Sequence, residues 1–503
     1  MEGISPSFEG RSVRFLMLLL ALEGACVMTC LRSCLLSTAV ALLFAGVARA
    51  QTLEEVLVTT YTSNPQIEAD RARQRALDDD VARAVGGWRP VATLQVQHGR
   101  GHDIYQYKQT KQNISPYYPA NPSYSVHEWR TPDNLLLQIQ QAIYDGGRTA
   151  ADLRHSQLAV ESGLATMVSV EQQVLGTAVQ SYYDLYRDEQ IAELARQNVA
   201  WLEEQAAAVH ARYQVKDVTQ TDVAQAEARL ARGLADLTSA EGTLEVTRSA
   251  FQAATGIVPG VLPEPPPPPV ALLPATREEA LALSDSSPDL RAALLSAMVA
   301  EADIDYVASG LMPNLSLQAT ARRMNDSDQA YLGTTDHQVM LSLTIPLYEG
   351  GVYAARTRSA KQTAGQRKLE ADMTRRKAVD MVNRSWQQLQ SARASIKSLT
   401  EQVRAADVAR TSIRAEMRVG TRTVLDQLNT EQELMDAKIA LLRARHDEVV
   451  ATYSVLVAVG HLTASNLNLP VQVYDPSVHY EQVRNQWFGT GIDEDYGKVR
   501  KPE

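Results

Sequence analysis

The chain has 503 residues, of which 45% are hydrophobic and 21% are charged, and its formal net charge is −10 at pH 7. This length allows several domains, and the acidic balance makes the chain a poor candidate for binding nucleic acid. The cysteines are Cys26, Cys30 and Cys34. Because all of them lie near the N-terminus, disulfides, thiolate metal sites and a cysteine nucleophile are not expected in the rest of the chain.

The N-terminus has the features of a targeting segment. A positively charged start and a short apolar run lead to the tripeptide at 48–50, which forms a cleavage signal before Gln51. Residues 1–50 are therefore predicted to be a signal peptide, with Met28 as an alternative start. Its cysteines do not follow the small-residue pattern of a lipoprotein signal, so no lipid anchor is expected. No apolar helix of about 20 residues follows it.

Two strands are predicted in the first half of the chain. After Pro90, which would end an incoming helix, apolar and polar residues alternate over 92–97, and they do so again over 135–143. The runs approach the ~9–11 residues of a strand that crosses a bilayer, and their polar partners are uncharged, as in the wall of a watery lumen. The Tyr- and Pro-rich residues 101–133 between them are predicted to form an extracellular loop. An ordinary soluble sheet with one wet face is the alternative.

A sharp turn from strand into helix is predicted next. Tyr144 is expected in the aromatic belt at the membrane surface, and Gly146 and Gly147 allow backbone conformations that other residues resist. From Gly147 to about Tyr213 the chain has no proline and is rich in good helix formers. About 65 helical residues reach roughly 100 Å, a length typical of a tube, spacer or coiled coil rather than a compact enzyme.

A second helix is predicted from about Asp222 to Ala254, with apolar residues every seven positions. They are Val223, Leu230, Leu237, Leu244 and Phe251. Sustained heptads predict helices that supercoil against their neighbours. A dimeric coiled coil or a plain bundle is the alternative when the helices are considered alone. A stiff proline-rich linker is predicted at 263–274.

The second half of the chain repeats the first. Tyr348-Glu349-Gly350-Gly351 matches the turn at 144–147 at an offset of 204 residues, whereas Pro313 matches Pro90 at an offset of 223. The difference places 19 extra residues in the first half, between the proline and the turn, and this is most simply a longer loop.

The repeat assigns equivalent elements to the second half. Strands are predicted at 315–320 and 339–347 with a shorter loop at 324–337, and a long helix from Gly351 to Met417. A second heptad run consists of Leu428, Met435, Leu442, Val449 and Leu456. The two repeats are assigned to residues 51–262 and 275–475, and a tail to 476–503.

The number of strands predicts a shared barrel. A sheet in lipid cannot leave its edges open, because unpaired amide groups there cost several kcal/mol each. Four strands are too few, since the smallest barrels have about eight. Two copies would supply eight strands and three would supply twelve. Three are favoured, because the same copies must also enclose a helical tube.

The chain after residue 50 resembles the TolC family of outer-membrane efflux and secretion ducts. The motifs that carry the resemblance are Arg418-Val419-Gly420-Thr421-Arg422-Thr423-Val424-Leu425-Asp426-Gln427-Leu428 and the tail motif Tyr474-Asp475-Pro476, His479-Tyr480, Val483-Arg484 and Trp487. The resemblance implies a mainly α chain with a transmembrane β-barrel: a homotrimer with twelve shared strands in outer-membrane lipid and a long helical tunnel in the periplasm. It also implies a periplasmic membrane-fusion adaptor and an inner-membrane pump. Within the family, a duct of the CyaE type for adenylate cyclase toxin is the expected relative.

The resemblance also implies a gate at the helix tips. Thr221, Asp222 and Arg422 match the family's contacts between neighbouring helices, and Asp426 matches its inner acidic ring. The chain departs from the family at Met417, where a tyrosine is common. It departs again at Asn429, where a second aspartate is common, so weaker cation selectivity is expected. The local alternative is that Asp222 and Asp426 belong to helix capping boxes.

No catalytic or phosphate-binding motif is present in the sequence, so no enzyme activity, cofactor or metal is expected. The energy for transport must then come from a partner. An ABC transporter exporting a protein cargo is favoured because the chain lacks a lipoprotein cysteine. The alternatives are small-molecule efflux with a proton-driven pump, and a purely structural periplasmic coiled coil.

Overall fold

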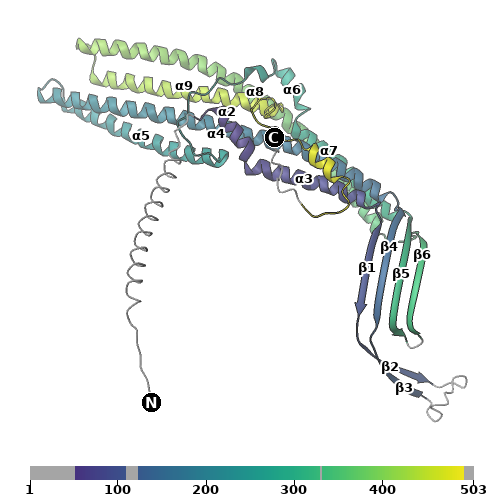
Figure 1. Cartoon of the computed structure of the whole chain (residues 1–503). Coiled ribbons are helices and arrows are strands. Elements are labelled where there is room, and N and C mark those ends of the chain that lie inside the picture. Colours follow the sequence, from purple (N-terminus) through teal and green to yellow (C-terminus); the bar gives the residue numbers. More distant parts are fainter. Residues whose placement is uncertain (1–50, 109–122, 329–330, 492–503) are drawn as a thin grey trace, which may run out of the picture. The chain divides into compact units, whose positions relative to one another are not determined.

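The structure is a computed structural model that describes residues 51–108, 123–328 and 331–491 (Figure 1). The predicted signal peptide, the alternative start and the end of the predicted tail lie outside the described residues. The chain divides into two compact units, one of which contains residues 51–52 and Val258–Pro265. In this small unit the Gln51 side chain donates to the Val258 carbonyl at 2.9 Å and accepts from the Gly260 amide at 3.1 Å. The other unit contains all the elements described below.

The helices of the larger unit fall into two equivalent sets. The first set is α2 (Leu53–Ser63), α3 (Pro65–Gly86), α4 (Arg148–Gln214) and α5 (Gln220–Thr255). The second set is α6 (Arg277–Ser284), α7 (Pro288–Ala308), α8 (Val352–Arg418) and α9 (Val424–Ala458), with the short helices η1 (Val270–Leu272), η2 (Ser309–Leu311) and α10 (Ser477–Val483). The predicted long helices are thus confirmed. In the described part of the chain, none of the helices is both long enough and apolar enough to cross a lipid bilayer.

The repeat is visible in the element boundaries. Helices α4 and α8 each have 67 residues. They begin at Arg148 and Val352, while α5 and α9 begin at Gln220 and Val424, so both pairs keep the offset of 204 residues. Pro65 and Pro288 occupy the first turns of α3 and α7, where a proline needs no amide partner.

Helix α4 occupies the centre of the helical part. It packs against α2, α3, α5, α7 and α9, whereas α8 packs mainly against α7 and α9 (Figure 1). Aromatic side chains fill part of this core: Tyr182 lies 6.5 Å from Phe251 and Tyr183 lies 6.3 Å from Tyr453, measured between ring centroids. These contacts join α4 to α5, its partner in the first hairpin, and to α9 of the second hairpin.

A four-stranded antiparallel sheet continues from the helices. Its strands are β1 (Val91–His98), β4 (Asp133–Tyr144), β5 (Asn314–Asp328) and β6 (Tyr331–Thr344), in the order β1-β4-β5-β6. The predicted strands are confirmed, but β5 and β6 extend through most of the predicted loop at 324–337. Pairing continues there because polar residues can form a ladder as well as apolar ones, for example between Arg323 and Thr335.

The register gives the sheet one apolar and one polar face. Residues directly opposite each other share a face. The apolar face carries Ala92, Leu94, Val96, Leu135, Leu137, Ile139, Leu315, Leu317, Ala319, Ala321, Val339, Leu341 and Leu343. The polar face carries Thr93, Gln95, Gln97, Asn134, Gln138, Gln140, Ser316, Gln318, Thr320, Gln338 and Ser342.

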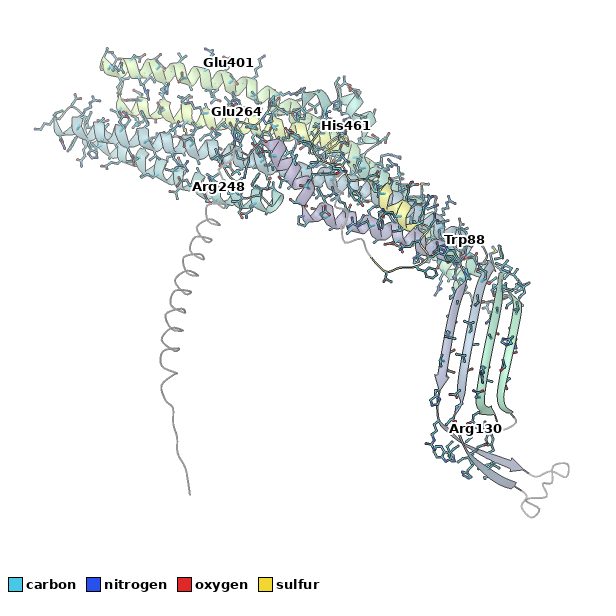
Figure 2. All side chains as sticks on the ribbon, in the orientation of Figure 1. Trp88, Arg130, Arg248, Glu264, Glu401 and His461 are labelled. Atoms are coloured by element: carbon cyan, nitrogen blue, oxygen red, sulfur yellow. The ribbon has the colours of Figure 1, made fainter. Side chains whose placement is uncertain are left out.

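The stretch predicted as a loop at 101–133 is largely a second sheet. Strands β2 (Gly101–Lys108) and β3 (Ser123–Arg130) pair as an antiparallel hairpin. Arg130 is buried at its base, within hydrogen-bond distance of the Tyr105 hydroxyl at 2.5 Å (Figure 2). The sequence predicted only an extracellular loop here. The strand pairing was not predicted, because the proline-rich centre of the stretch hid the alternation on either side of it.

The tail motif packs on the first half of the chain. The Tyr474 amide donates to the Tyr61 hydroxyl at 3.2 Å, and the Arg71 guanidinium lies over the Tyr474 ring at 5.1 Å. Farther along, Arg89 donates to the Gln486 carbonyl at 2.6 Å. These contacts give the motif a structural role, since they tie the chain's end to the helices that precede the sheet.

Candidate functional site

The tips of the two helical hairpins are built alike. The α4–α5 connection places Lys216 in the left-handed region at φ 59°, and the α8–α9 connection places Gly420 there at φ 80°. These positions are equivalent in the repeat. Glycine adopts this conformation without steric cost, whereas lysine does not.

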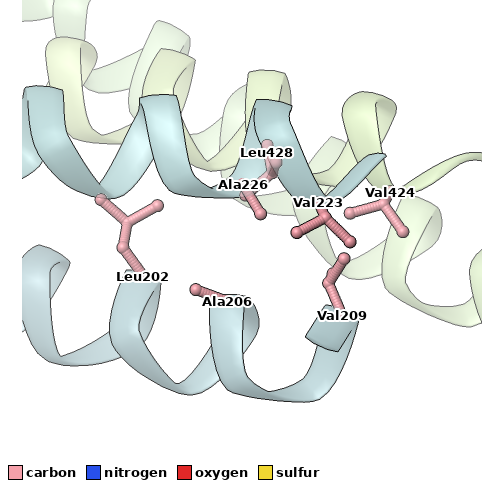
Figure 3. Close-up of a cluster of buried hydrophobic side chains, with 7 residues drawn as sticks. All are labelled: Leu202, Ala206, Val209, Val223, Ala226, Val424 and Leu428. Carbon is pink, nitrogen blue, oxygen red and sulfur yellow. The ribbon is translucent and has the colours of Figure 1, made fainter. Parts of the chain in front are cut away.

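A small apolar cluster holds the tips together (Figure 3). It consists of the buried residues Leu202, Ala206, Val209, Val223, Ala226, Val424 and Leu428. They come from α4, α5 and α9, so the first hairpin is packed directly against the second near the predicted gate. The cluster fixes where the polar tip residues lie.

The two predicted gate aspartates form capping boxes. Asp222 Oδ2 accepts from the Thr219 amide and hydroxyl, both at 2.8 Å, and the Asp222 amide donates to Thr219 Oγ1 at 3.3 Å. Asp426 makes the same set with Thr423, with its carboxylate accepting at 3.0 and 2.9 Å. The local alternative proposed from the sequence is therefore confirmed. Hydrogen bonds from the threonine amides, and then from their hydroxyls, lower the pKa of both carboxyls.

Arg422 is held within its own tip. Its Nε donates to Glu416 Oε2 at 2.8 Å. Among the described residues of one chain, it makes no hydrogen bond with Thr221 or Asp222, and Thr221 is exposed. The described residues of one chain therefore do not contain the pairing that the resemblance implies. The other tip has an analogous ion pair, from Arg212 to Asp217 at 2.7 Å.

Asn429 faces the other hairpin. Its Oδ1 accepts from Arg229 Nη2 at 2.6 Å, a bond that joins α9 to α5. The sequence interpretation missed both Arg229 and Glu416. The signal for Glu416 was available as an opposite charge six residues before Arg422. Arg229 had no local signal, because its contact depends on how two hairpins pack.

The turns that join the sheet to the long helices differ between the halves. In the first turn, Asp145 accepts from the Gly147 amide at 3.1 Å and from the Thr149 amide at 2.8 Å. Gly146 and Gly147 have φ values of 72° and 84°. A β-carbon at Gly146 would lie 2.5 Å from Met312 Cβ and 2.8 Å from the Ser309 carbonyl oxygen. Glycine is required there for both conformation and space.

The second turn has the same backbone but open surroundings. Gly350 and Gly351 have φ values of 61° and 80°, and a β-carbon at either would meet nothing within 4 Å. Tyr144 is half exposed and Tyr348 is 86% exposed, as expected for the aromatic belt at a membrane surface. Trp88, at the start of β1, is also exposed (Figure 2).

The described residues offer no site for metal chemistry. They contain no group of three or more His, Cys, Asp or Glu arranged to hold a metal ion. The arrangement consists instead of a two-faced sheet, long helices and polar tips. Those parts suit conduction across a membrane.

Comparison with known proteins identifies the class. The model of the family described as outer membrane efflux protein matches residues 280–461. The outer membrane efflux protein BepC of Brucella suis is 31% identical over 469 residues, which cover 92% of this chain and 98% of that protein. The outer membrane protein TolC of Vibrio cholerae is 26% identical over 436 residues, covering 83% and 92%. The solved CmeC outer membrane channel of Campylobacter jejuni covers 86% of this chain and 89% of its own, with a TM-score of 0.73 at 13% identity.

The chain is therefore an outer-membrane channel with a periplasmic helical tunnel, and it is not an enzyme. It belongs to the TolC family of outer membrane efflux proteins. Channels of this family are trimers that work with an adaptor and an inner-membrane pump. The expectation of a CyaE-type relative needs correction: CyaE of Bordetella pertussis is 23% identical over 305 residues, so BepC is more similar to this chain.

Proposed function

We propose that three copies of this chain form one duct for the efflux of small molecules, closed at its periplasmic end by the helix tips. The open sheet carries this proposal. Among the described strands, β1 and β6 each pair with one neighbour, so both edges of the four-stranded sheet are free to pair. If β1 of each copy pairs with β6 of the next, the polar face lines a continuous lumen and no amide is left unpaired in lipid.

Helix α8 supports the same assembly. Its exposed apolar residues are Val352, Leu369, Met373, Val379, Met381 and Val408. A single chain leaves them in water, whereas a neighbouring copy would cover them. Packing between copies would then extend from the sheet along the helices.

We place the gate at the tips because charged side chains of both hairpins lie there. Arg422 and Glu416 lie on one tip, and Asp222 lies on the other. When copies associate, Arg422 can exchange its partner Glu416 for Thr221 and Asp222 of a neighbour. Asp426 and Asn429 would line the inner ring, with one carboxylate per chain rather than two.

Single-channel conductance tests the gate. Arg422→Ser should raise the conductance of the reconstituted channel, because it removes the cation that bridges copies. Arg212→Ser is the matched control, since it breaks the analogous ion pair of the first tip and leaves Arg422 in place. Unchanged conductance in Arg422→Ser, or an equal rise in both variants, would remove Arg422 from the gate.

The efflux assignment rests on the family description and on the name of BepC. A proton-driven pump is the corresponding inner-membrane partner. Protein secretion through an ABC transporter is the second candidate. It is favoured by the similarity to the proteases secretion protein PrtF of Dickeya chrysanthemi, 24% identical over 457 residues and 87% of this chain.

Complementation separates the two cargoes. The chain would be expressed in bacteria that lack their own channel of this family and that carry either a drug pump or a protein exporter. Restored resistance to toxic small molecules without secretion of the protein cargo supports efflux. The opposite result would replace efflux by secretion, and failure of both would count against the duct.

A further inference from the structure

Two adjacent arginines on β5 lie on opposite faces of the sheet. Arg322 pairs across the strands with Leu136 and Asp336, and Arg323 pairs with Leu135 and Thr335. Arg322 therefore belongs to the polar face, where its Nε donates to Asn134 Oδ1 at 3.1 Å. Arg323 belongs to the apolar face. A cation on the side that meets lipid requires a physical explanation.

The depth of Arg323 follows from the strand geometry. The inner limit of the apolar face lies at Leu315, which pairs with Tyr144 of the aromatic belt. Eight residues separate Leu315 from Arg323, about 26 Å along the strand and roughly 20 Å along the membrane normal at the usual tilt. Because the apolar band of such barrels is about 25 Å tall, Arg323 lies within about 5 Å of the outer boundary of the hydrocarbon. An arginine on the lipid face costs about 2–4 kcal/mol at the midplane but close to zero at this boundary.

Histidine and aspartate side chains share this face near Arg323. His337 lies on the same face, since it pairs with Ala321, the next residue of β5 on that face. Asp133 also lies on this face, but its carboxylate contacts His98 Nδ1 at 2.6 Å. Among the described residues, no carboxylate lies within ion-pair distance of the Arg323 guanidinium, although that side chain is exposed. Asp326 is engaged elsewhere, where it accepts from the Thr131 amide at 2.6 Å.

We propose that Arg323, with His337 beside it, binds a phosphate group of an outer-leaflet glycolipid whose acyl chains lie on the apolar face below. A guanidinium can donate two parallel hydrogen bonds to a phosphate, and the anion supplies the charge that the protein lacks at this point. The apolar side chains directly beneath, Leu137 and Val339, contact the acyl chains. The inference rests on the outer-membrane location and is independent of the cargo.

A binding measurement tests the proposal on the full-length trimer in mild detergent. The probe is a diphosphorylated glycolipid of the lipid A type, and retention of bound lipid is followed by native mass spectrometry. Arg323→Gln should weaken binding about tenfold, the factor that corresponds to loss of one charge-assisted hydrogen bond. Arg322→Gln is the matched control and should bind as the unmodified trimer does. Equal binding by both variants, or equal loss in both, overturns the assignment.

Two further arms identify the ligand. The same glycolipid without phosphate should bind Arg323→Gln and the unmodified trimer equally, and a difference between them would contradict recognition through phosphate. Inorganic phosphate should not displace the lipid, whereas displacement at equal concentration would indicate a free-anion site and overturn the lipid assignment.

If Arg323→Gln does not assemble, Arg323→Lys is used instead. It keeps the charge without the paired donors and should bind with intermediate strength. The conductance of these variants is measured as well. If it equals that of the unmodified trimer, the duct is intact, and an unexpected binding result then counts against this proposal alone.

Discussion

Helices α4 and α8 have the same length and equivalent places in the repeat, yet they differ in burial. Twenty-two residues of α4 are buried against seven of α8, so α4 lies inside the chain and α8 at its surface. Within the described residues, the large exposed apolar side chains lie mainly on α8 rather than on α4, where Tyr213 is the example. The repeat therefore does not make two equal halves. Helix α4 holds the chain together, whereas α8 leaves its surface for another copy.

The largest expected effect contrasts the two strand-to-helix turns. Gly146→Ala places a β-carbon 2.5 Å from Met312 Cβ in a left-handed conformation, so the trimer should fail to form or lose more than about 3 kcal/mol. Gly350→Ala meets no neighbour and should cost only the backbone strain, about 1–2 kcal/mol. The yield and melting temperature of heat-modifiable trimer measure both variants. Equal losses would mean that the first turn is no more tightly packed than the second.

The next effect contrasts the long helices themselves. Leu185→Ala in α4 removes a side chain with no exposed surface and should cost about 2–5 kcal/mol of the unfolding free energy. Leu369→Ala in α8 removes a side chain that is 67% exposed in one chain, so the fold of the chain should change little while the trimer dissociates more readily. Circular dichroism reports helix melting, and light scattering in detergent reports the trimer. A Leu369 variant with normal trimer stability would count against α8 as a contact surface.

The smallest effect concerns the tips, where the two halves are expected to respond alike. Thr219→Ala and Thr423→Ala each remove one capping box, and loss of such a cap costs about 1 kcal/mol. Because the pKa of Asp222 and of Asp426 is lowered in the folded chain, their stabilisation is present above the ordinary value of 3.8 and is lost as the pH falls through the lower folded value. Hydrogen exchange at the first turns of α5 and α9 measures both effects. Amide exchange rates in the unmodified chain that do not change with acid would contradict the pH dependence. Rates that do not change on either threonine substitution would contradict the role of the capping boxes.

Much of the architecture was predictable because it depends on local patterns. The alternation around Leu94 and Leu341 predicts the strands and their apolar face, and the glycine pair at Gly146 and Gly147 predicts the turn. Long proline-free runs predict α4 and α8 to within a residue or two of their ends. In these places the local preference and the final structure agree.

The remaining features depend on contacts between distant segments. The β2–β3 hairpin was missed because the proline-rich residues between its strands indicate a loop, and no pattern within one strand reports the pairing of His102 with Trp129. The bond from Arg229 to Asn429 depends on the packing of α5 against α9, and no spacing within one helix reports it. Arg323 could be assigned to the lipid side only once the register of β5 with its neighbours was known.

The two free edges of the sheet have a consequence for biogenesis. A lone copy that entered the bilayer would expose a row of unpaired amides to hydrocarbon on each side, at a cost of several kcal/mol per group. Insertion and oligomer formation must therefore be one concerted event. The rate of channel appearance should rise more steeply than linearly with the supply of newly exported chains, so a modest fall in synthesis would remove channels out of proportion.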